Sequence, residues 1–141
     1  MNILETEWWT VAVPPEWWAE SEEDSILIGD RDGVGCIQIS TLRKDSGDFT
    51  DPEVEEMARA EADAGVEWRR VTLGDFGGLS CNWQEQDSAI REWYLFRGGL
   101  LLYVTYSCEV ENSGMDDAAV DELLDTLLVL ASQGTGPALR E

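Results

Sequence analysis

Carboxylates dominate the side chains that could do chemistry in this chain. Its 141 residues include 30 Asp and Glu, nine Lys and Arg and no His, which gives a formal net charge of −21. The absence of histidine removes the usual general base near neutral pH and the commonest metal ligand. Two carboxyl groups could share acid–base catalysis, but no spacing in this acid-rich sequence isolates such a pair. We therefore expect a non-enzyme with no catalytic residues, no metal site and no cofactor.

Cysteine thiols are the second group of candidates. Cys36, Cys81 and Cys108 are far apart and include no CxxC pair, so their spacing does not resemble a zinc site. A nucleophilic cysteine needs a nearby base or a local positive field, and this chain is strongly negative. All three lie in strand-like runs, so we expect them to be structural and to pack as small apolar side chains.

An acidic segment from Asp30 to Gly33 (DRDG) has some of the chemistry of a calcium loop. A calcium-binding loop needs another oxygen ligand two residues further on and a bidentate glutamate at its end. Val34, whose side chain has no oxygen, occupies the position of that ligand, and strand-like sequence follows it. Acidic residues followed by glycine are typical of a hairpin turn, which is the structure that we expect here.

Tryptophans are the candidates for binding a partner. Trp8 and Trp9 are adjacent, and so are Trp17 and Trp18, on the two sides of Pro14 and Pro15. Neighbouring side chains of a strand point to opposite faces, so both members of a pair cannot enter one core. Tryptophan is enriched at interaction hot spots. We expect Trp9, Trp17 or Trp18 to contact a partner; the alternative is that all seven tryptophans belong to the core.

Strands are the elements that must position these groups. Residues 16–18 read as a turn or a single helical turn after the double proline. The breaks between the later β-rich segments are short, so their strands should be antiparallel neighbours. The β-branched and aromatic content predicts strands at residues 8–13, 25–29, 34–42, 66–73, 79–86, 89–96 and 100–108.

Two helices complete the prediction. The first begins at Thr50 or Asp51, has Pro52 in its first turn, and ends at Gly65. The second covers residues 116–131, where apolar side chains recur with helical spacing. Its apolar stripe consists of Val120, Leu123, Leu124, Leu127, Leu128 and Ala131.

The order of these elements predicts an α+β fold, with an antiparallel sheet of about six or seven strands and both helices packed on it. Residues 100–108 are apolar on both strand faces, so we expect this strand at the centre of the sheet. Residues 1–131 form the single predicted domain, and residues 132–141 a flexible tail. Residues 1–10 have no signal-peptide pattern, and no apolar run approaches the roughly twenty residues of a membrane span, so we expect a cytoplasmic protein.

The element order resembles the PsbP/MOG-like fold group, which includes bacterial domain families of unknown function and the DcrB-like chaperones of type VI secretion effectors. The resemblance rests on "VAVPPEWW" at residues 11–18, "IQIS" at 37–40, an acidic helix from Asp51, "YVTYSCEV" at 103–110 and a leucine-striped final helix. It covers nearly the whole chain. The resemblance implies a binding protein, chaperone or accessory factor, and it supplies no catalytic residues.

The leading hypothesis is a non-catalytic module that binds a protein or peptide, basic or amphipathic, as a chaperone or adaptor. The negative potential repels nucleic acid and attracts basic partners. A second hypothesis is an immunity or inhibitor protein that blocks a basic toxin or nuclease by charge mimicry. A third is a small-ligand-binding protein or hydrolase with a pocket between sheet and helix. The acidity could also reflect habitat or genome composition and not a partner.

Overall fold

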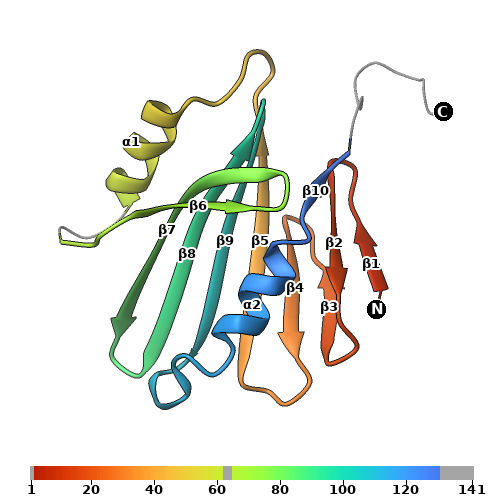
Figure 1. The fold of residues 1–141 in the computed structure, drawn as a ribbon, viewed down its shortest axis with the longest axis vertical. Helices are drawn as coiled ribbons and strands as arrows, with labels where there is room; N and C mark the ends of the chain where they lie inside the picture. The colour runs from red at the N-terminus through yellow and green to blue at the C-terminus, as the bar shows by residue number, and fades with distance from the viewer. Residues whose placement is uncertain (1, 62–64, 131–141) are drawn as a thin grey trace.

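The computed structural model describes residues 2–61 and 65–130 and contains two antiparallel sheets. The smaller sheet has the order β1 (Asn2–Glu5), β2 (Trp9–Val13) and β10 (Leu128–Val129). The larger has the order β3 (Trp17–Ser21), β4 (Ser25–Asp30), β5 (Gly35–Arg43), β9 (Leu100–Glu109), β8 (Ser88–Arg97), β7 (Phe76–Glu85) and β6 (Arg69–Leu73). The remaining elements are α1 (Asp51–Glu61), the short 3₁₀ helix η1 (Val110–Asn112) and α2 (Asp117–Leu124) (Figure 1).

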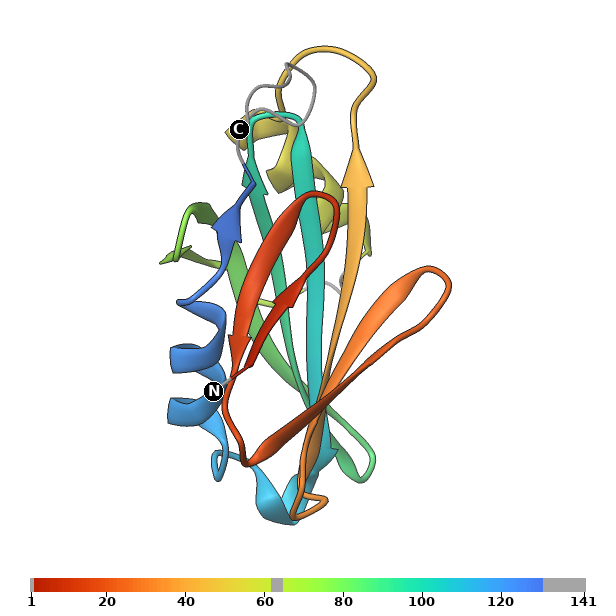
Figure 2. The same ribbon diagram turned by 90° about the vertical axis from the view of Figure 1, so that its right-hand side faces the viewer.

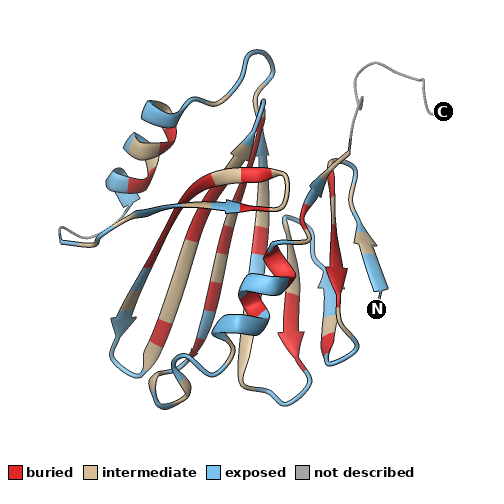
Figure 3. Ribbon diagram, in the orientation of Figure 1, coloured by how far each residue is buried: buried red, intermediate tan, exposed pale blue. Residues whose placement is uncertain are grey.

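The main core lies between one face of the large sheet and a layer formed by the small sheet and α2 (Figure 2). Alternate residues of each strand point to this face. Ile37 and Ile39 of β5 and Val104 of β9 meet Val11 of β2 and Leu124 of α2 there, and all five are fully buried. Figure 3 shows the buried side of α2 turned toward the sheet.

A second, smaller core lies on the opposite face, under α1. Val54 and Ala58 of this helix pack against Leu101 of β9. The helix begins with a reciprocal capping arrangement, since the Glu53 N–H donates to Thr50 Oγ1 over 3.3 Å and the Thr50 N–H donates to Glu53 Oε1 over 3.4 Å. Thr50 is therefore the capping residue of the two that the sequence offered.

The predicted α+β class and an antiparallel sheet with β9 at its centre are confirmed. The single sheet of about six or seven strands is confirmed only in part, because the predicted strand at residues 8–13 became β2 of the smaller sheet and β3 took a place in the larger one. The hairpin turn after Asp30 is confirmed too: Gly33 has a positive φ of 77° and its N–H donates to the Asp30 carbonyl over 3.1 Å. The predicted tail at residues 132–141 and the last helical position, Ala131, lie outside the described residues.

Three expectations are corrected. The turn expected at residues 16–18 ends at Glu16, where the Trp17 N–H donates to the Pro14 carbonyl over 3.0 Å. Trp17 and Trp18 begin β3 and pair with Asp30 and Gly29 of β4. The second, three-stranded sheet was not expected, because its outer strand β1 has only four residues and β10 has only two.

The final helix ends at Leu124 and does not reach residue 131. The Thr126 hydroxyl donates to the Leu123 carbonyl over 2.7 Å and accepts the Ala12 N–H of β2 over 2.8 Å. The Asp125 carboxylate meanwhile accepts the Gly74 N–H over 2.8 Å. These contacts replace the continuation of the helix. Leu127 is still buried, but Leu128 belongs to β10 and is 51% exposed.

Candidate functional site

The predicted contact tryptophans occupy three different environments. Trp9 is fully buried, and its indole N–H donates to Thr41 Oγ1 over 3.0 Å. Trp17 is only 5% exposed and belongs to the main core. Trp18 is half-buried and lies against Gly29, where a Cβ would collide with its ring. This corrects the expectation that Trp9 or Trp17 presents its ring to a partner, because neither ring is available at the surface.

An open groove of about 940 Å³ lies on one face of the large sheet. Its floor comes from β6, β7 and β8, and α2 forms one side. The floor is built by the alternation of each strand, which brings Val71 of β6, Ser80 of β7 and Trp93 of β8 to one face. Residues 65–67 lie at the approach to β6. The groove therefore lies beside the docked helix, on the face that carries the main core.

Arg91 of β8 lines this groove. One of its terminal nitrogens is 2.8 Å from Asp121 Oδ1 and the other is 3.4 Å from Asp117 Oδ1, both on α2. Its guanidinium carbon lies 4.7 Å from the centroid of the Trp93 ring. The Arg91 Nε is buried without a hydrogen-bond partner among the described residues. The side chain is only 17% exposed, so these pairs attach α2 to the floor of the groove.

Acidic side chains outnumber basic ones around the groove. Glu67, Asp121, Glu122 and Asp125 line it, against Arg91 and one exposed arginine of β6. Asp121 holds Arg91 and Asp125 accepts the Gly74 N–H, whereas Glu67 and Glu122 form no ion pair among the described residues. Two carboxylates are thus available for a cationic group that enters the groove.

One stretch of β7 borders the groove as an open sheet edge. β6 pairs with residues 76–80 of β7 only, while β8 pairs with residues 77–85. Residues 81–85 therefore have no strand partner on their outer side within the part of the chain that the structure describes. Trp83 lies on this edge, is half-buried, and lines both the groove and an adjoining hollow of about 250 Å³.

The cysteines are in environments that suppress their reactivity. Burial, reinforced by the Glu92 carboxylate, raises the pKa of the Cys81 thiol to about 12. Burial also raises the pKa of Cys36 and that of Cys108. The Glu92 carboxylate accepts the Tyr103 hydroxyl over 3.0 Å, and burial together with this contact raises the pKa of Tyr103. The geometry gives no activated nucleophile at these positions.

A pair of carboxyl groups lies at the other end of the sheet, next to α2. Asp30 is 7% exposed and accepts the N–H groups of Val34 over 2.8 Å and Gly35 over 3.2 Å. The Tyr106 hydroxyl donates to Asp116 Oδ2 over 2.6 Å. Burial and the neighbouring Asp30 raise the pKa of Asp116. Burial opposes the ionisation of Asp30, but the hydrogen bonds that it accepts lower its pKa.

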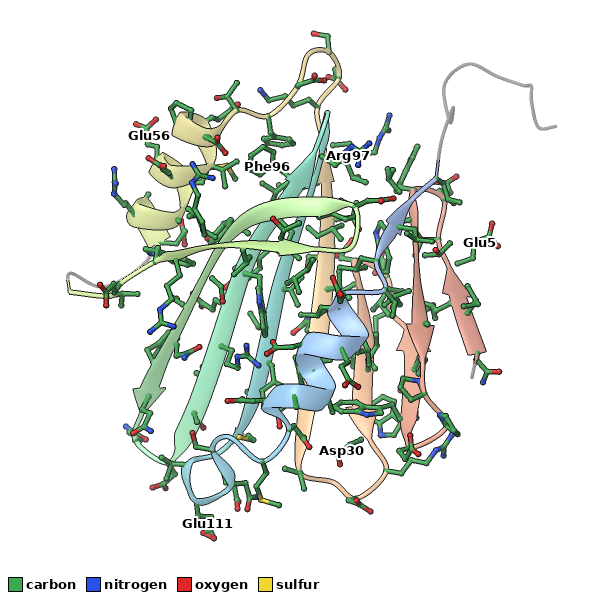
Figure 4. The ribbon with its side chains drawn as sticks, viewed as in Figure 1. Glu5, Asp30, Glu56, Phe96, Arg97 and Glu111 are labelled. Carbon is green, nitrogen blue, oxygen red and sulfur yellow. The ribbon has the colours of Figure 1, made fainter. Side chains whose placement is uncertain are left out.

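Asp30 holds the β4–β5 turn, and Asp116 immediately precedes α2. The contact between the two carboxyl groups therefore attaches this turn to the start of the helix. Figure 4 shows Asp30 beneath that helix. The carboxylate of Asp30 fixes the hairpin turn, so its role differs from the calcium ligation weighed from the sequence. No group of three or more His, Cys, Asp and Glu side chains is arranged to hold a metal within residues 2–61 and 65–130. Across the same residues, none of the helices has the length and apolarity that a membrane crossing requires.

Comparison with known proteins identifies similar folds only. No family model matches the sequence, and no curated protein does. A crystal structure of a protein from Bacteroides thetaiotaomicron VPI-5482 is similar with a TM-score of 0.67 at 18% identity, over 92% of this chain and 48% of that one. The chain thus spans about half the length of the Bacteroides protein.

A second similar structure is that of LpqN, a protein involved in cell envelope biogenesis of Mycobacterium tuberculosis. Its TM-score is 0.58 at 12% identity, and the match covers 86% of this chain and 82% of LpqN. At these identities the likeness concerns the fold. The chain therefore has a fold that occurs among bacterial proteins, and the narrower PsbP/MOG-like assignment stays a prediction.

The third hypothesis from the sequence included a pocket between sheet and helix, but it did not name the residues that line this groove. Its residues come from β6, β7, β8 and α2, and nothing in their spacing along the chain brings them together. One signal was present: Arg91 is an arginine on the core-facing side of a strand, between Ala89 and Trp93. A charged residue in that position needs a partner, and Asp117 and Asp121 of the final helix supply it.

Proposed function

We propose that this chain is a non-catalytic binding module that holds an extended, basic segment of a partner protein in the groove beside α2. The observation that carries the proposal is the open edge of β7, at residues 81–85, bordering a groove with unpaired carboxylates. An extended peptide can add to such an edge through main-chain hydrogen bonds. Alternate side chains of that peptide then enter the groove.

The side chains around this edge give the complex its selectivity. Trp83 offers a half-buried aromatic surface next to the peptide backbone, and aromatic anchors supply much of the energy of such interfaces. Glu67 and Glu122 attract lysine or arginine side chains, and the net charge of −21 speeds the approach of a basic partner. Trp18 is the remaining candidate from the sequence and would belong to a separate contact.

The test begins with selection of random displayed peptides on the immobilised protein, followed by synthesis of the selected peptides. We expect them to be rich in lysine or arginine and in β-branched residues. Trp83→Ala should weaken their binding by about 2 kcal/mol. Glu122→Lys should weaken it as well, whereas Glu56→Lys should not, because Glu56 is an exposed residue of α1 (Figure 4). Equal effects of the two lysine variants, or selection of acidic peptides, would overturn the proposal.

We also propose that the fold belongs to the PsbP/MOG-like group and that the role is that of a chaperone or adaptor, as the sequence resemblance implies. Members of that group are mostly binding proteins, chaperones or accessory factors, which supports a role without catalysis. We retain the cytoplasm as the proposed location. LpqN acts in cell envelope biogenesis, so fractionation of the native cells, with detection of the chain in cytoplasm or envelope, decides between the two compartments.

A further inference from the structure

A small hollow of about 210 Å³ lies where β5, β8 and β9 meet at one end of the large sheet. Three cations line it, Arg43, Lys44 and Arg97, and its described lining contains no carboxylate. The chain has 30 acidic residues and only nine basic ones, so the charge of this hollow is opposite in sign to that of the chain as a whole. Figure 4 shows Arg97 at this end of the sheet, remote from Asp30.

The strand register brings the two arginines to the same face. Arg43 of β5 and Arg97 of β8 are both paired with Leu100 of the central strand β9, one on each side. Leu100 is buried, and its side chain belongs to the main core. Since two strand spacings separate Arg43 from Arg97, their Cα atoms are about 10 Å apart. Two side chains as long as arginine can converge on one group across that distance.

The charges of these two arginines are not neutralised by carboxylates. Within the described residues neither forms an ion pair; Arg97 donates to the Asp75 main-chain carbonyl over 3.0 Å. The guanidinium carbon of Arg43 lies 3.7 Å from the centroid of the Trp8 ring. Stacking occupies the face of a guanidinium and leaves its N–H edge free to donate. Lys44, in contrast, is already paired with Glu53 over 2.7 Å.

The rest of the lining is largely apolar. Trp8 is half-buried on one side, and Leu100 lies between the arginines. Val129 and Leu130 form another wall, which the Leu130 N–H attaches to the Trp8 carbonyl over 2.8 Å. The hollow thus combines two unpaired guanidinium groups with apolar walls, and it has room for a small charged group and part of the body that carries it.

We propose that this hollow binds an organic anion. A carboxylate or phosphate group of the ligand accepts hydrogen bonds from Arg43 and Arg97, and its apolar portion packs against Trp8, Leu100 and Leu130. Charge-assisted, bidentate contacts of this kind are the strongest that arginine makes. The surrounding negative potential opposes entry of any anion, so a ligand with an apolar body should bind better than a bare inorganic ion.

The experiment uses the full chain, labelled with ¹⁵N in its arginine side chains, at constant ionic strength. Phenyl phosphate, benzoate, inorganic phosphate and benzylammonium are titrated separately. We expect saturable shifts of the Nε–H signals of Arg43 and Arg97 with the two aromatic anions. Shifts with one aromatic anion and not the other identify phosphate or carboxylate as the preferred group. Inorganic phosphate should bind more weakly, and benzylammonium should not shift these signals.

Two variants of equal charge change complete the test. Arg43→Gln should weaken binding of the preferred anion about tenfold. Arg31→Gln should leave it unchanged, because Arg31 is an exposed arginine of the β4–β5 turn without an ion pair among the described residues. Arg43 is exposed, and a melting curve verifies that each variant is folded. Absence of saturable binding of both aromatic anions, or equal losses in the two variants, would overturn the proposal.

Discussion

The carboxyl groups of Asp30 and Asp116 meet beside α2, where burial and hydrogen bonds shift their pKa values in opposite directions. Asp116 binds its proton more tightly in the folded chain than in the unfolded one, because it is buried next to Asp30. Its contribution to stability is therefore complete at a pH below its ordinary pKa and is lost as the pH rises through the raised pKa. Asp30 has a lowered pKa, so its contribution is present above the ordinary pKa of aspartate and is lost as the pH falls.

Asp116→Asn should make the protein more stable at pH 7, by about 1 kcal/mol. The amide oxygen still accepts the Tyr106 hydroxyl, the amide N–H can donate to Asp30, and no proton is needed to hold the pair together. The gain should shrink as the pH falls toward the ordinary pKa of aspartate, where the wild-type Asp116 is protonated. Urea unfolding at pH 7 and at lower pH measures both effects.

Asp24→Asn is the matched control, because Asp24 is an exposed acid between β3 and β4 and loses the same charge. Its effect should be small at every pH. A variant Asp116→Asn that is less stable than the wild type at pH 7 would show that the carboxylate form of Asp116 is the one that the fold requires.

At the scale of elements, β7 decides the shape of the groove. Its first half pairs with β6, and its second half leaves β6 and continues as an edge (Figure 1). Gly78 lies in the first half, where the backbone of β8 comes very close: an added Cβ would collide with the Tyr94 carbonyl oxygen. A side chain at this position would push β7 off β8 and displace β6 with it.

Gly78→Ala should therefore destabilise the fold by about 3 kcal/mol or more. The neighbouring residue is an internal control. A Cβ on Gly77 would meet only the Val71 carbonyl oxygen at 3.8 Å, an ordinary contact, and alanine is preferred to glycine inside a strand. Gly77→Ala should be neutral or slightly stabilising. Thermal melts of the two variants give the comparison, and similar melting temperatures would contradict the predicted clash between a side chain at residue 78 and β8.

The elements that the sequence predicts well are those with a strong local signal. Residues 100–108 are apolar on both faces and lie at the centre of the sheet; the DRDG segment is a hairpin turn; and Thr50 caps α1. The end of α2 was missed because Thr126 is tied to Ala12 of β2, far away in the chain. The residues of the groove and of the cationic hollow were missed because they are far apart in the sequence. Only the register between neighbouring strands brings Arg91 and Arg97 next to the other residues of these two hollows.

At the scale of the whole molecule, charge is the dominant property. Ion pairs among the described residues involve only Lys44, Arg59, Arg70 and Arg91, so most of the 30 acids have no cationic partner. Pairs at the surface contribute little in any case. Repulsion among the remaining carboxylates opposes the compact state.

The melting temperature should therefore rise with sodium chloride between about 0.01 M and 1 M, where the Debye length falls from about 30 Å to about 3 Å. Differential scanning calorimetry at neutral pH measures the change. A neutral osmolyte at matched water activity separates screening from a general solvent effect, because it does not shorten the Debye length. A melting temperature that is flat across this range would mean that the carboxylates are already too dispersed to repel one another.

The three-stranded sheet has a consequence for biosynthesis. β2 pairs on one side with β1, which precedes it directly, and on the other with β10, which follows more than a hundred residues later. While the ribosome is still making the large sheet, the β1–β2 hairpin has an open edge, and the apolar face of β2 that carries Trp9 waits for α2. Completion of the core thus depends on the last described strand, and a nascent chain stalled before residue 128 would expose an aggregation-prone edge.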